Sequence, residues 1–193
     1  MKQHDAPPPG FKLAYEIVSP SEEEALIQLM DASDLRCAPY DPGNARASAS
    51  FGWKYLFAAD SFERCAPIPE GLQSIAGKAA AFAGLEVDDI AECLLNRYEP
   101  GAIIQPHFDK PVFEHVIGVS LGATSVMHFR KPGADGDDHR AVELPRRSIY
   151  LLAGQARDTY QHSLPPIAVT RWSLTFRSLS EVGVRLRDGV AAG

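Results

Sequence analysis

Two stretches in the first half of the chain repeat their apolar residues at the spacing of an amphipathic helix. Residues 21–24, Ser-Glu-Glu-Glu, have the form of a capping box and open the first, which we expect to end between Asp31 and Asp34. The second runs from Leu72 to Ala83 with a 3.6-residue period, and Gly84 is placed to end it. The pattern therefore predicts two helices that each turn one face to a core.

The segment between these helices, residues 36–69, has the composition of a loop. It is rich in Pro, Gly, Ala and Ser and includes the aromatic sequence Phe-Gly-Trp-Lys-Tyr at residues 51–55. Long connections inside compact domains are frequently functional lids. We therefore expect a long loop with short strands that covers a substrate, with Trp53 and Tyr55 as its candidate substrate-contacting side chains.

After residue 90 the chain changes to short apolar or alternating runs at intervals of roughly ten residues, with turn residues between them, which is typical of an all-β region. The sequence thus predicts one α+β domain over residues 1–193. We expect residues 1–89 to form helices and the lid, and residues 90–180 to form a sandwich or barrel closed by strands from both ends. The runs are residues 93–95, 116–121, 126–129, 148–152 and 172–176.

The composition is that of a single globular domain, with 193 residues of which 45% are hydrophobic and 23% charged. A chain of this length buries roughly 70% of the surface that its unfolded form exposes, so packing alone can stabilise it. Its three cysteines, at positions 37, 65 and 93, lie far apart, which favours a reduced, cytoplasmic setting. No secretion signal and no apolar run of roughly 18 residues is present, so we expect no membrane association. We also favour a monomer.

The net charge of −6 is opposite in sign to that of a protein with a general phosphate-binding surface. Any contact with nucleic acid must therefore be local. Three basic pairs are candidates for such a contact, and each is equally explained as a solvated surface. They are Arg130 with Lys131, Arg146 with Arg147, and Arg185 with Arg187.

A histidine and a carboxylate stand two residues apart at His107 and Asp109. On a strand, this spacing directs both side chains to one face. With the distant His162 they make a set of two histidines and one carboxylate, which occupies one face of an octahedral iron(II) and leaves three positions for a chelating co-substrate and dioxygen. The alternative is that His107 and Asp109 form a surface pair and His162 is a loop histidine. His128 is a rival ligand, but it lacks a carboxylate two residues away.

Two arginines and a serine alternate with apolar residues further along the chain. Arg171, Ser173 and Arg177 share one face of a predicted strand, while Trp172 and the other apolar residues take the opposite face. Buried polar groups need partners, and the planar fork of arginine binds carboxylates while it stays charged. A dicarboxylate such as 2-oxoglutarate would satisfy both arginines, although internal Asp or Glu residues are alternative partners.

Together these segments resemble the AlkB family of iron(II)- and 2-oxoglutarate-dependent oxygenases. The resemblance covers residues 93–178 and implies a double-stranded β-helix (jelly-roll) core with N-terminal helices and a substrate lid. It also implies an Fe(II) site with 2-oxoglutarate and O2 as co-substrates. The matching segments are Cys-Leu-Leu-Asn-Arg-Tyr-Glu-Pro-Gly-Ala at 93–102, His-Phe-Asp at 107–109, Val-Ser-Leu-Gly at 119–122, His162, and Arg-Trp-Ser-Leu-Thr-Phe-Arg at 171–177.

The same resemblance assigns roles to individual residues. It implies that Arg171 binds the distal carboxylate of 2-oxoglutarate with help from Tyr98. It further implies that Asn96 and Arg177 approach the metal-bound end of that molecule. Ser173 stands where some relatives carry asparagine.

Residues 144–148 and 151–157 look especially like the oxygenase domain of the AlkB homologue that modifies wobble uridine in tRNA. One departure from the family's DNA-repair founder concerns the substrate. That protein carries an acidic pair after its His-x-Asp-Lys, where this chain has Lys110-Pro111-Val112. We therefore expect poor demethylation of 1-methyladenine and 3-methylcytosine.

The implied activity is oxidative decarboxylation of 2-oxoglutarate coupled to hydroxylation of a nearby C–H bond. The leading hypothesis is an enzyme that hydroxylates or oxidatively demethylates an alkylated nucleobase in DNA or RNA, with Trp53 or Tyr55 stacking on the base. The alternatives are a tRNA-modifying hydroxylase and a protein or small-molecule hydroxylase. A noncatalytic binding module with the same fold belongs to a different class of function.

Overall fold

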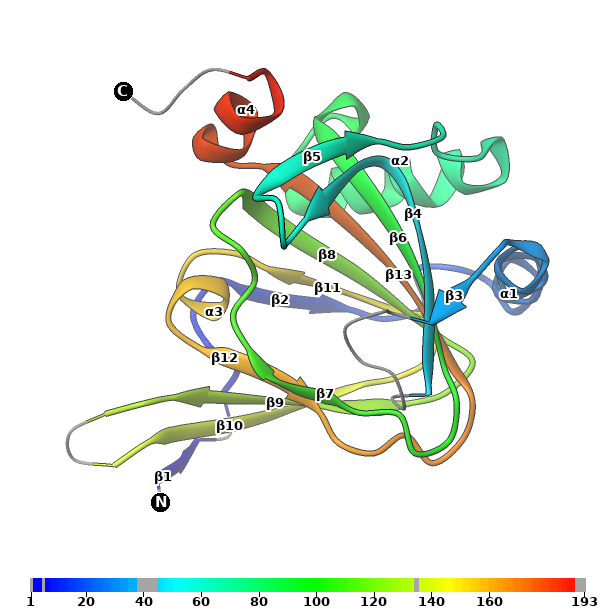
Figure 1. The fold of residues 1–193 in the computed structure, drawn as a ribbon. Helices are drawn as coiled ribbons and strands as arrows, with labels where there is room; N and C mark the ends of the chain where they lie inside the picture. Colours follow the sequence, from blue (N-terminus) through cyan, green and yellow to red (C-terminus); the bar gives the residue numbers. More distant parts are fainter. Residues whose placement is uncertain (1, 5, 38–44, 134–135, 190–193) are drawn as a thin grey trace.

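A computed structural model describes residues 2–4, 6–37, 45–133 and 136–189, which fold as two facing β-sheets with helices packed outside the larger one (Figure 1). We call the larger one the major sheet. Its strand order is β2 (Phe11–Ala14), β11 (Ser148–Leu152), β8 (Phe113–Leu121), β13 (Arg171–Leu179), β6 (Ile90–Tyr98), β4 (Arg46–Leu56) and β3 (Arg36–Cys37), with β5 (Ser61–Arg64) paired to β4.

The smaller sheet, which we call the minor sheet, faces the concave side of the major sheet. Its strand order is β1 (Lys2–His4), β10 (Asp138–Leu144), β9 (Ser125–Lys131), β12 (Gln161–Leu164) and β7 (Ile104–His107). Both sheets include strands from the start of the chain, namely β1 and β2. The predicted β-sandwich closed by strands from both ends is therefore confirmed, and it is the jelly-roll that the family resemblance implies.

Two helices cover the outer face of the major sheet, as the apolar periodicity predicts. They are α1 (Pro20–Ala32) and α2 (Glu70–Ala83), and α2 ends at Gly84 in the left-handed conformation. The capping box of α1 is formed by Ser19 and Glu22, so the N-cap lies two residues before the predicted Ser21. Shorter helices are the 3-10 helix η1 (Val87–Asp89), α3 (Gln155–Asp158) and α4 (Glu181–Arg187).

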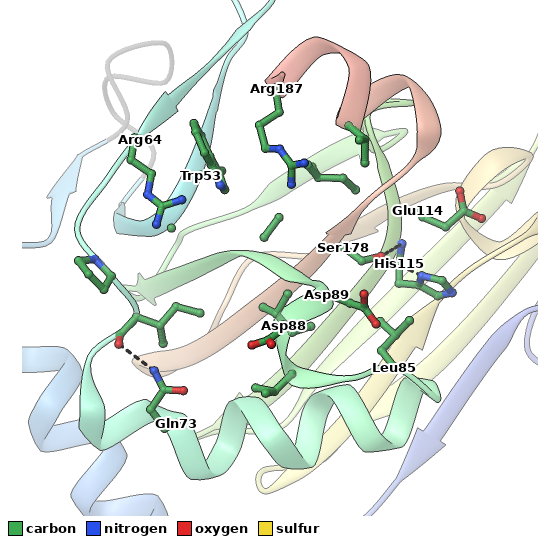
Figure 2. A pocket seen from close by; sticks show the side chains of 18 residues that line it. Trp53, Arg64, Gln73, Leu85, Asp88, Asp89, Glu114, His115, Ser178 and Arg187 are labelled. Carbon is green, nitrogen blue, oxygen red and sulfur yellow. Dashed lines mark hydrogen bonds between the residues drawn. The ribbon is translucent and has the colours of Figure 1, made fainter. Parts of the chain in front are cut away.

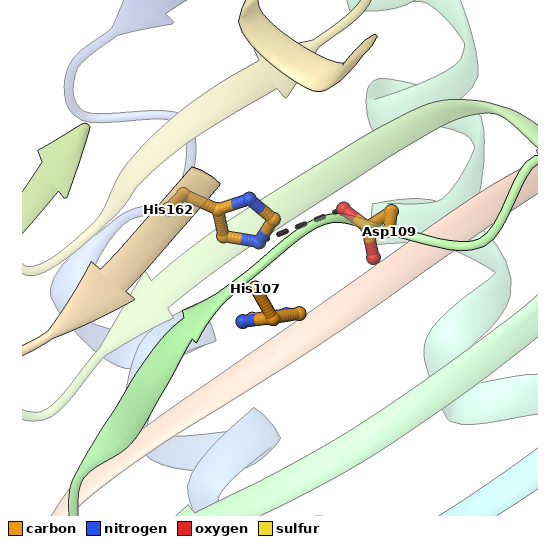
Figure 3. A group of neighbouring side chains, drawn as sticks. All are labelled: His107, Asp109 and His162. Atoms are coloured by element: carbon orange, nitrogen blue, oxygen red, sulfur yellow. Dashed lines mark ion pairs between the residues drawn. The ribbon is translucent and has the colours of Figure 1, made fainter. Parts of the chain in front are cut away.

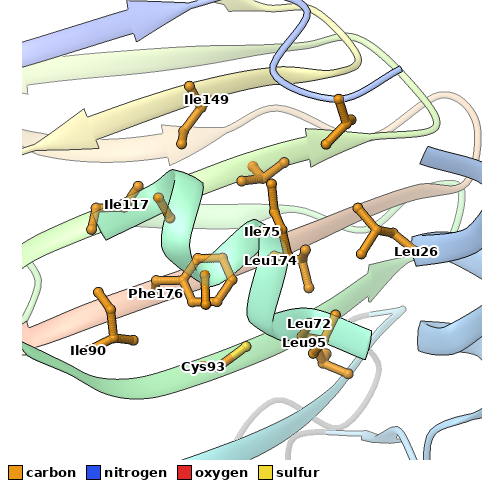
Figure 4. Close-up of a cluster of buried hydrophobic side chains, with 14 of the residues drawn as sticks. Leu26, Leu72, Ile75, Ile90, Cys93, Leu95, Ile117, Ile149, Leu174 and Phe176 are labelled. Atoms are coloured by element: carbon orange, nitrogen blue, oxygen red, sulfur yellow. The ribbon is translucent and has the colours of Figure 1, made fainter. Parts of the chain in front are cut away.

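Apolar side chains from these helices and from the outer face of the major sheet form the larger core. Leu72 and Ile75 of α2 pack over Cys93, Leu174 and Phe176 of the central strands (Figure 4). A second cluster of buried apolar side chains fills the space between the two sheets. All five predicted apolar runs lie within strands of these sheets. The strands that contain these runs are β6, β8, β9, β11 and β13.

The predicted long loop between the helices is wrong for much of its length. Residues 46–56 form the eleven-residue strand β4, which pairs with β6 from Arg46 opposite Tyr98 to Gly52 opposite Glu92. At Gly52 the backbone adopts φ of +81°, and a Cβ there would overlap the carbonyl oxygen of Ala91. The glycine thus permits β4 to leave β6 and pair with β5. Residues 38–44 of this segment lie outside the described residues.

The sequence pattern also missed β10 and α4. Residues 132–137 connect β9 to β10, and residues 134 and 135 of this connection are not described. Within the described ranges, no helix has the length and apolar content needed to cross a membrane.

Candidate active site

His107, Asp109 and His162 meet at the open edge of the minor sheet (Figure 3). His107 ends β7 and lies directly opposite His162 of the neighbouring strand β12, and the centroids of the two rings are 4.3 Å apart. A carboxylate oxygen of Asp109 is 3.5 Å from Nε2 of His162. Each of the three residues offers one ligand atom, and these three atoms lie within 4.8 Å of one another.

The expectation that His107 and Asp109 share one face of a strand is wrong. Strand β7 ends at His107, so Asp109 lies in the connection to β8 and does not share a strand face with the histidine. The intervening Phe108 is 44% exposed, and Asp109 turns inward instead. Convergence on one point therefore depends on the bend after β7 as well as on the two-residue spacing.

The donor atoms of this group suit a divalent metal ion. Nδ1 of His107 lies 2.9 Å from the carbonyl oxygen of Gln105, a contact in which an Nδ1–H donates and Nε2 keeps its lone pair for a metal. Burial lowers the pKa of His162 to about 4 against the opposing effect of Asp109, so this imidazole is neutral at neutral pH.

Asp109 supplies the negative charge of the group. Burial raises the pKa of Asp109, but the nearby His162 and Arg177 outweigh it and hold the pKa below the ordinary value. The carboxylate oxygen Oδ2 is buried without a hydrogen-bond partner among the described residues. The neutral imidazole of His162, a second histidine whose Nε2 is free and an ionised carboxylate with an unsatisfied oxygen match the facial set that iron(II) takes.

His128 does not belong to this group. It lies on β9, between Met127 and Phe129, which are both buried in the core between the sheets. Because neighbouring residues of a strand alternate in direction, the exposed side chain of His128 points away from the interior. The rival ligand set is therefore not assembled.

Arg171 lies on the inner face of the major sheet with 1% of its surface exposed. Its Nε and one terminal nitrogen donate to the hydroxyl of Ser120, at 3.2 and 3.0 Å, and its guanidinium lies over the ring of Tyr98. The other terminal nitrogen is buried and has no partner among the described residues. A buried cation with a free donor and, within the described ranges, no carboxylate partner can bind an anion from outside the chain.

Asn96 and Ser173 lie on the same inner face of the major sheet as Arg171, each two residues along its strand from the Tyr98–Arg171 pair. They are directly opposite each other on β6 and β13, and Ser173 is also opposite Ser120 on β8. Asn96 and Ser173 are each 2% exposed, and the side-chain oxygen of Asn96 has no partner among the described residues. Asn96 and Ser173 thus offer buried polar atoms beside Arg171.

Arg177 has an internal partner, which is the alternative that the sequence left open. It donates to the buried carboxylate of Glu92 at 2.8 Å, and its other terminal nitrogen is 3.9 Å from a carboxylate oxygen of Asp109. Glu92 was not identified from the sequence, where it is one of many acidic residues. Arg177 therefore connects the candidate metal ligand Asp109 to the sheet and still keeps its Nε without a partner among the described residues.

The two candidate lid residues have different surroundings. Tyr55 is 7% exposed, donates its hydroxyl to Asp60, and packs edge-on against Phe57, Phe62 and Phe113. In this conformation its ring has the position of a core residue. Its role in stacking on a substrate base stays a prediction.

Trp53 lies beneath the guanidinium of Arg64, which is 4.8 Å from the ring centre. It lines a cavity of about 550 Å³ between β4, α4 and the start of β6, together with Asp88 and Arg187 (Figure 2). None of the three metal-ligand candidates lines this cavity. The substrate-contacting role of Trp53 likewise stays a prediction.

The basic pairs are largely engaged with acidic neighbours. Arg146 and Arg147 both pair with the buried carboxylate of Glu23 on α1, and Arg147 also pairs with Glu16. Arg130 pairs with Asp137, Arg185 with Glu181, and Arg187 with Asp188. These contacts support the interpretation of each pair as ordinary surface.

Sequence comparison decides the family. Residues 42–178 match the model of the 2OG-Fe(II) oxygenase superfamily, a range that includes every candidate metal-ligand and co-substrate residue. The chain belongs to this superfamily. Its site therefore takes iron(II), with 2-oxoglutarate and O2 as co-substrates, and the His-Asp-His group fits that metal.

Curated relatives place this oxygenase in the AlkB branch. It is 29% identical over 164 residues to the tRNA (carboxymethyluridine(34)-5-O)-methyltransferase alkbh8 of Xenopus tropicalis, covering 82% of this chain and 26% of that protein. It is 30% identical over 125 residues to the alpha-ketoglutarate-dependent dioxygenase AlkB of Salmonella typhimurium, covering 59% of this chain and 57% of that protein. The chain thus spans about a quarter of the length of the first of these relatives.

A solved structure has the same fold. The structure of OsALKBH1 superposes with a TM-score of 0.69 at 17% sequence identity, covering 90% of this chain and 99% of that one. This likeness confirms the jelly-roll with its outer helices.

Proposed function

We propose that this AlkB-branch oxygenase hydroxylates or oxidatively demethylates an alkylated nucleobase in DNA or RNA. The observation that carries the proposal is the pairing of two features in the space between the sheets. A His-Asp-His metal group lies at the edge of the minor sheet, and a buried arginine with a free donor lies on the facing sheet. One site can thus hold iron and a dicarboxylate together.

Bound iron(II) supplies the activation of dioxygen that couples decarboxylation of 2-oxoglutarate to hydroxylation of a C–H bond. The side chains do the binding and orientation. Arg171, with Tyr98, holds the distal carboxylate of 2-oxoglutarate, while Asn96 and Arg177 hold the end nearer the metal. Because Arg171, Tyr98 and Asn96 are buried, water is excluded from their polar contacts and each contact is stronger.

The substrate side of the metal group is open and aromatic. His107 is exposed, Phe108 beside it is 44% exposed, and Phe57 at the tip of the β4–β5 hairpin is 57% exposed. The ammonium of Lys110, next to the metal ligand Asp109, lies 5.5 Å from the ring centre of Phe57. Exposed rings around the metal suit a planar substrate, because every base has a face that can stack.

The segment after Asp109 bears on which base is accepted. The carbonyl oxygens of Pro111 and Val112 accept hydrogen bonds from the side chain and backbone of Ser180, which fixes this segment to the start of α4. It carries no carboxylate that could reach the exocyclic amine of a base. We therefore place 1-methyladenine and 3-methylcytosine low among the candidate substrates.

A second candidate function is hydroxylation of a modified tRNA base. It is favoured by the match of 82% of this chain to a relative named for its action on carboxymethyluridine in tRNA. A protein or small-molecule substrate on the same scaffold is the remaining alternative. All of these share the same iron and co-substrate chemistry, so only the substrate distinguishes them.

A mass-spectrometric screen tests this proposal. The protein is incubated with iron, ascorbate and 2-oxoglutarate and a panel of methylated DNA, RNA and tRNA, and product bases are quantified beside succinate. We expect one class of nucleic acid to give a hydroxylated or demethylated base in proportion to succinate. Vigorous succinate production with no altered base in any pool would move the assignment to a protein or small-molecule hydroxylase.

A further inference from the structure

Tyr150 is a buried tyrosine on the inner face of the major sheet that the family resemblance does not assign to the site. It lies on β11 directly opposite Gly118 of β8, and a Cβ on Gly118 would overlap the phenol carbon and the hydroxyl oxygen of Tyr150. The end of the ring therefore lies across the glycine, pointing from β11 toward β13. On the other side, the ring of Phe11 is nearly parallel at 6.2 Å.

This position places the phenol beside the co-substrate residues. Residues two apart on a strand point to one face, so Gly118 is next to Ser120, the hydroxyl that accepts from Arg171. Gly118 is also opposite Thr175, which lies between Ser173 and Arg177 on β13. The phenol end thus overlies the part of the sheet between the two candidate carboxylate-binding arginines.

The hydroxyl of Tyr150 is a donor that lacks an acceptor. The residue is 8% exposed, and the described residues supply no hydrogen bond to its hydroxyl. Burial raises the pKa of Tyr150 to about 12, so the phenol keeps its proton. Arg171, Tyr98, Asp109 and Arg177 are close enough to affect this pKa electrostatically. The hydroxyl is not fully enclosed, so its free donor can give a hydrogen bond to an acceptor that arrives with a ligand.

We propose that Tyr150 is a co-substrate-binding residue, whose hydroxyl donates a hydrogen bond to the 2-oxoglutarate carboxylate that Arg171 binds. Gly118 makes this possible, because any larger residue there would displace the ring from the sheet. The inference rests on the co-substrate role of Arg171. A packing role alone would be served equally well by phenylalanine, since the contacts with Gly118 and Phe11 involve the ring.

The substitution Tyr150→Phe separates these two roles. Binding of 2-oxoglutarate is measured by calorimetry with Mn(II) in place of iron, and the melting temperature of the apo protein is measured alongside. The proposal expects an affinity loss on the order of tenfold, as for a hydrogen bond to a charged acceptor. It also expects an apo melting temperature that is unchanged or higher. In turnover, the KM for 2-oxoglutarate rises while kcat is kept.

Two further variants make the result decisive. Tyr160→Phe removes another buried tyrosine hydroxyl, which bonds Asp138 at 2.5 Å on the minor sheet, and should keep the affinity for 2-oxoglutarate. Arg171→Met tests the site itself. If Arg171→Met abolishes binding and Tyr150→Phe leaves it unchanged, the Tyr150 inference alone is wrong. If Arg171→Met leaves binding intact, the co-substrate site is misplaced. A lower apo melting temperature in Tyr150→Phe, with the affinity for 2-oxoglutarate unchanged, would assign the hydroxyl a structural role instead.

Discussion

Arg171 and Arg177 have equivalent places in the sequence pattern but different surroundings in the fold. Arg171 donates to a serine hydroxyl and keeps a buried donor free, whereas Arg177 is already paired with Glu92. The alternation of the strand predicts that both point inward. It cannot predict which one has an internal carboxylate, because Glu92 reaches Arg177 through the pairing of β6 with β13.

The two arginine variants should therefore differ in stability as well as in binding. Arg171→Met should weaken the binding of 2-oxoglutarate by about 2–5 kcal/mol, because a buried charged contact is lost. Arg177→Met should in addition lower the free energy of unfolding by about 3–5 kcal/mol, since Glu92 is left as an unpaired buried charge. Calorimetry with Mn(II) and urea unfolding check this. Adding Glu92→Gln to Arg177→Met should restore stability but not binding; if stability stays low, the Glu92 pair is not the cause.

Other residues of the site illustrate the same limit of sequence reasoning. His107, Asp109, His162 and Arg171 were recognisable because their types and spacing are those of a known chemistry. Tyr150 was not, because its hydroxyl reaches the site only through the pairing of β11 with β8 and the absence of a side chain at Gly118. Such contacts between distant strands leave no local pattern.

At the scale of elements, apolar periodicity predicted the helices and the strands that carry core residues. It failed for β4, where Ala and Ser alternate without a strong apolar face, and for β10, whose seven residues include Asp, His, Arg and Glu. These strands form by pairing with a neighbour already in a sheet. Their existence is decided by tertiary contacts more than by intrinsic preference.

Helix α1 is held to the sheets by the buried carboxylate of Glu23. The carboxylate of Glu23 accepts hydrogen bonds from the side chain of Arg146 at 2.6 Å and from the backbone N–H of Gly122 at 2.8 Å. Glu23→Gln should lower the free energy of unfolding by about 3 kcal/mol, the low end of the range for a broken buried pair, because Arg146 is half-exposed. Urea unfolding at neutral pH measures this loss.

The effect of pH on this contact has a definite sign. Burial raises the pKa of Glu23, but the hydrogen bonds from Arg146 and Gly122 outweigh it and leave the pKa below the ordinary 4.5. The stability from Glu23 is therefore present above pH 4.5 and is lost as the pH falls through the lowered value. The stability difference between the wild type and Glu23→Gln should shrink in that acidic window. A difference that stays constant down to acid pH would contradict the assignment.

Strand β4 carries both candidate lid residues, and alanine variants distinguish their roles. If either side chain stacks on a substrate base, its removal should cost roughly 1–3 kcal/mol and raise the substrate's KM without changing uncoupled 2-oxoglutarate turnover. Because Tyr55 is buried, Tyr55→Ala should also lower the free energy of unfolding by about 3–5 kcal/mol. Trp53 is half-buried, so Trp53→Ala should lower the free energy of unfolding by less. Unchanged KM values in both variants would remove β4 from substrate recognition.

For the molecule as a whole, charge bears on how a nucleic acid would be held. The net charge is −6, and the basic pairs noted in the sequence are engaged with acidic neighbours. We expect weak, salt-sensitive binding to unmodified nucleic acid and poor repair of 1-methyladenine or 3-methylcytosine in duplex DNA. Fluorescence anisotropy across a salt series and a duplex repair assay check this. Efficient duplex repair at physiological salt would show that Pro111 does not exclude these bases.

The most direct test of the account is iron-dependent conversion of 2-oxoglutarate to succinate by the wild type and by His107→Ala, Asp109→Ala and His162→Ala. The wild type should produce succinate only with iron. Each variant should lose this activity while it keeps its fold by circular dichroism, because two remaining ligands do not hold the metal in its facial geometry. Full succinate production by any folded variant, or production by the wild type without iron, would contradict the assignment of the site.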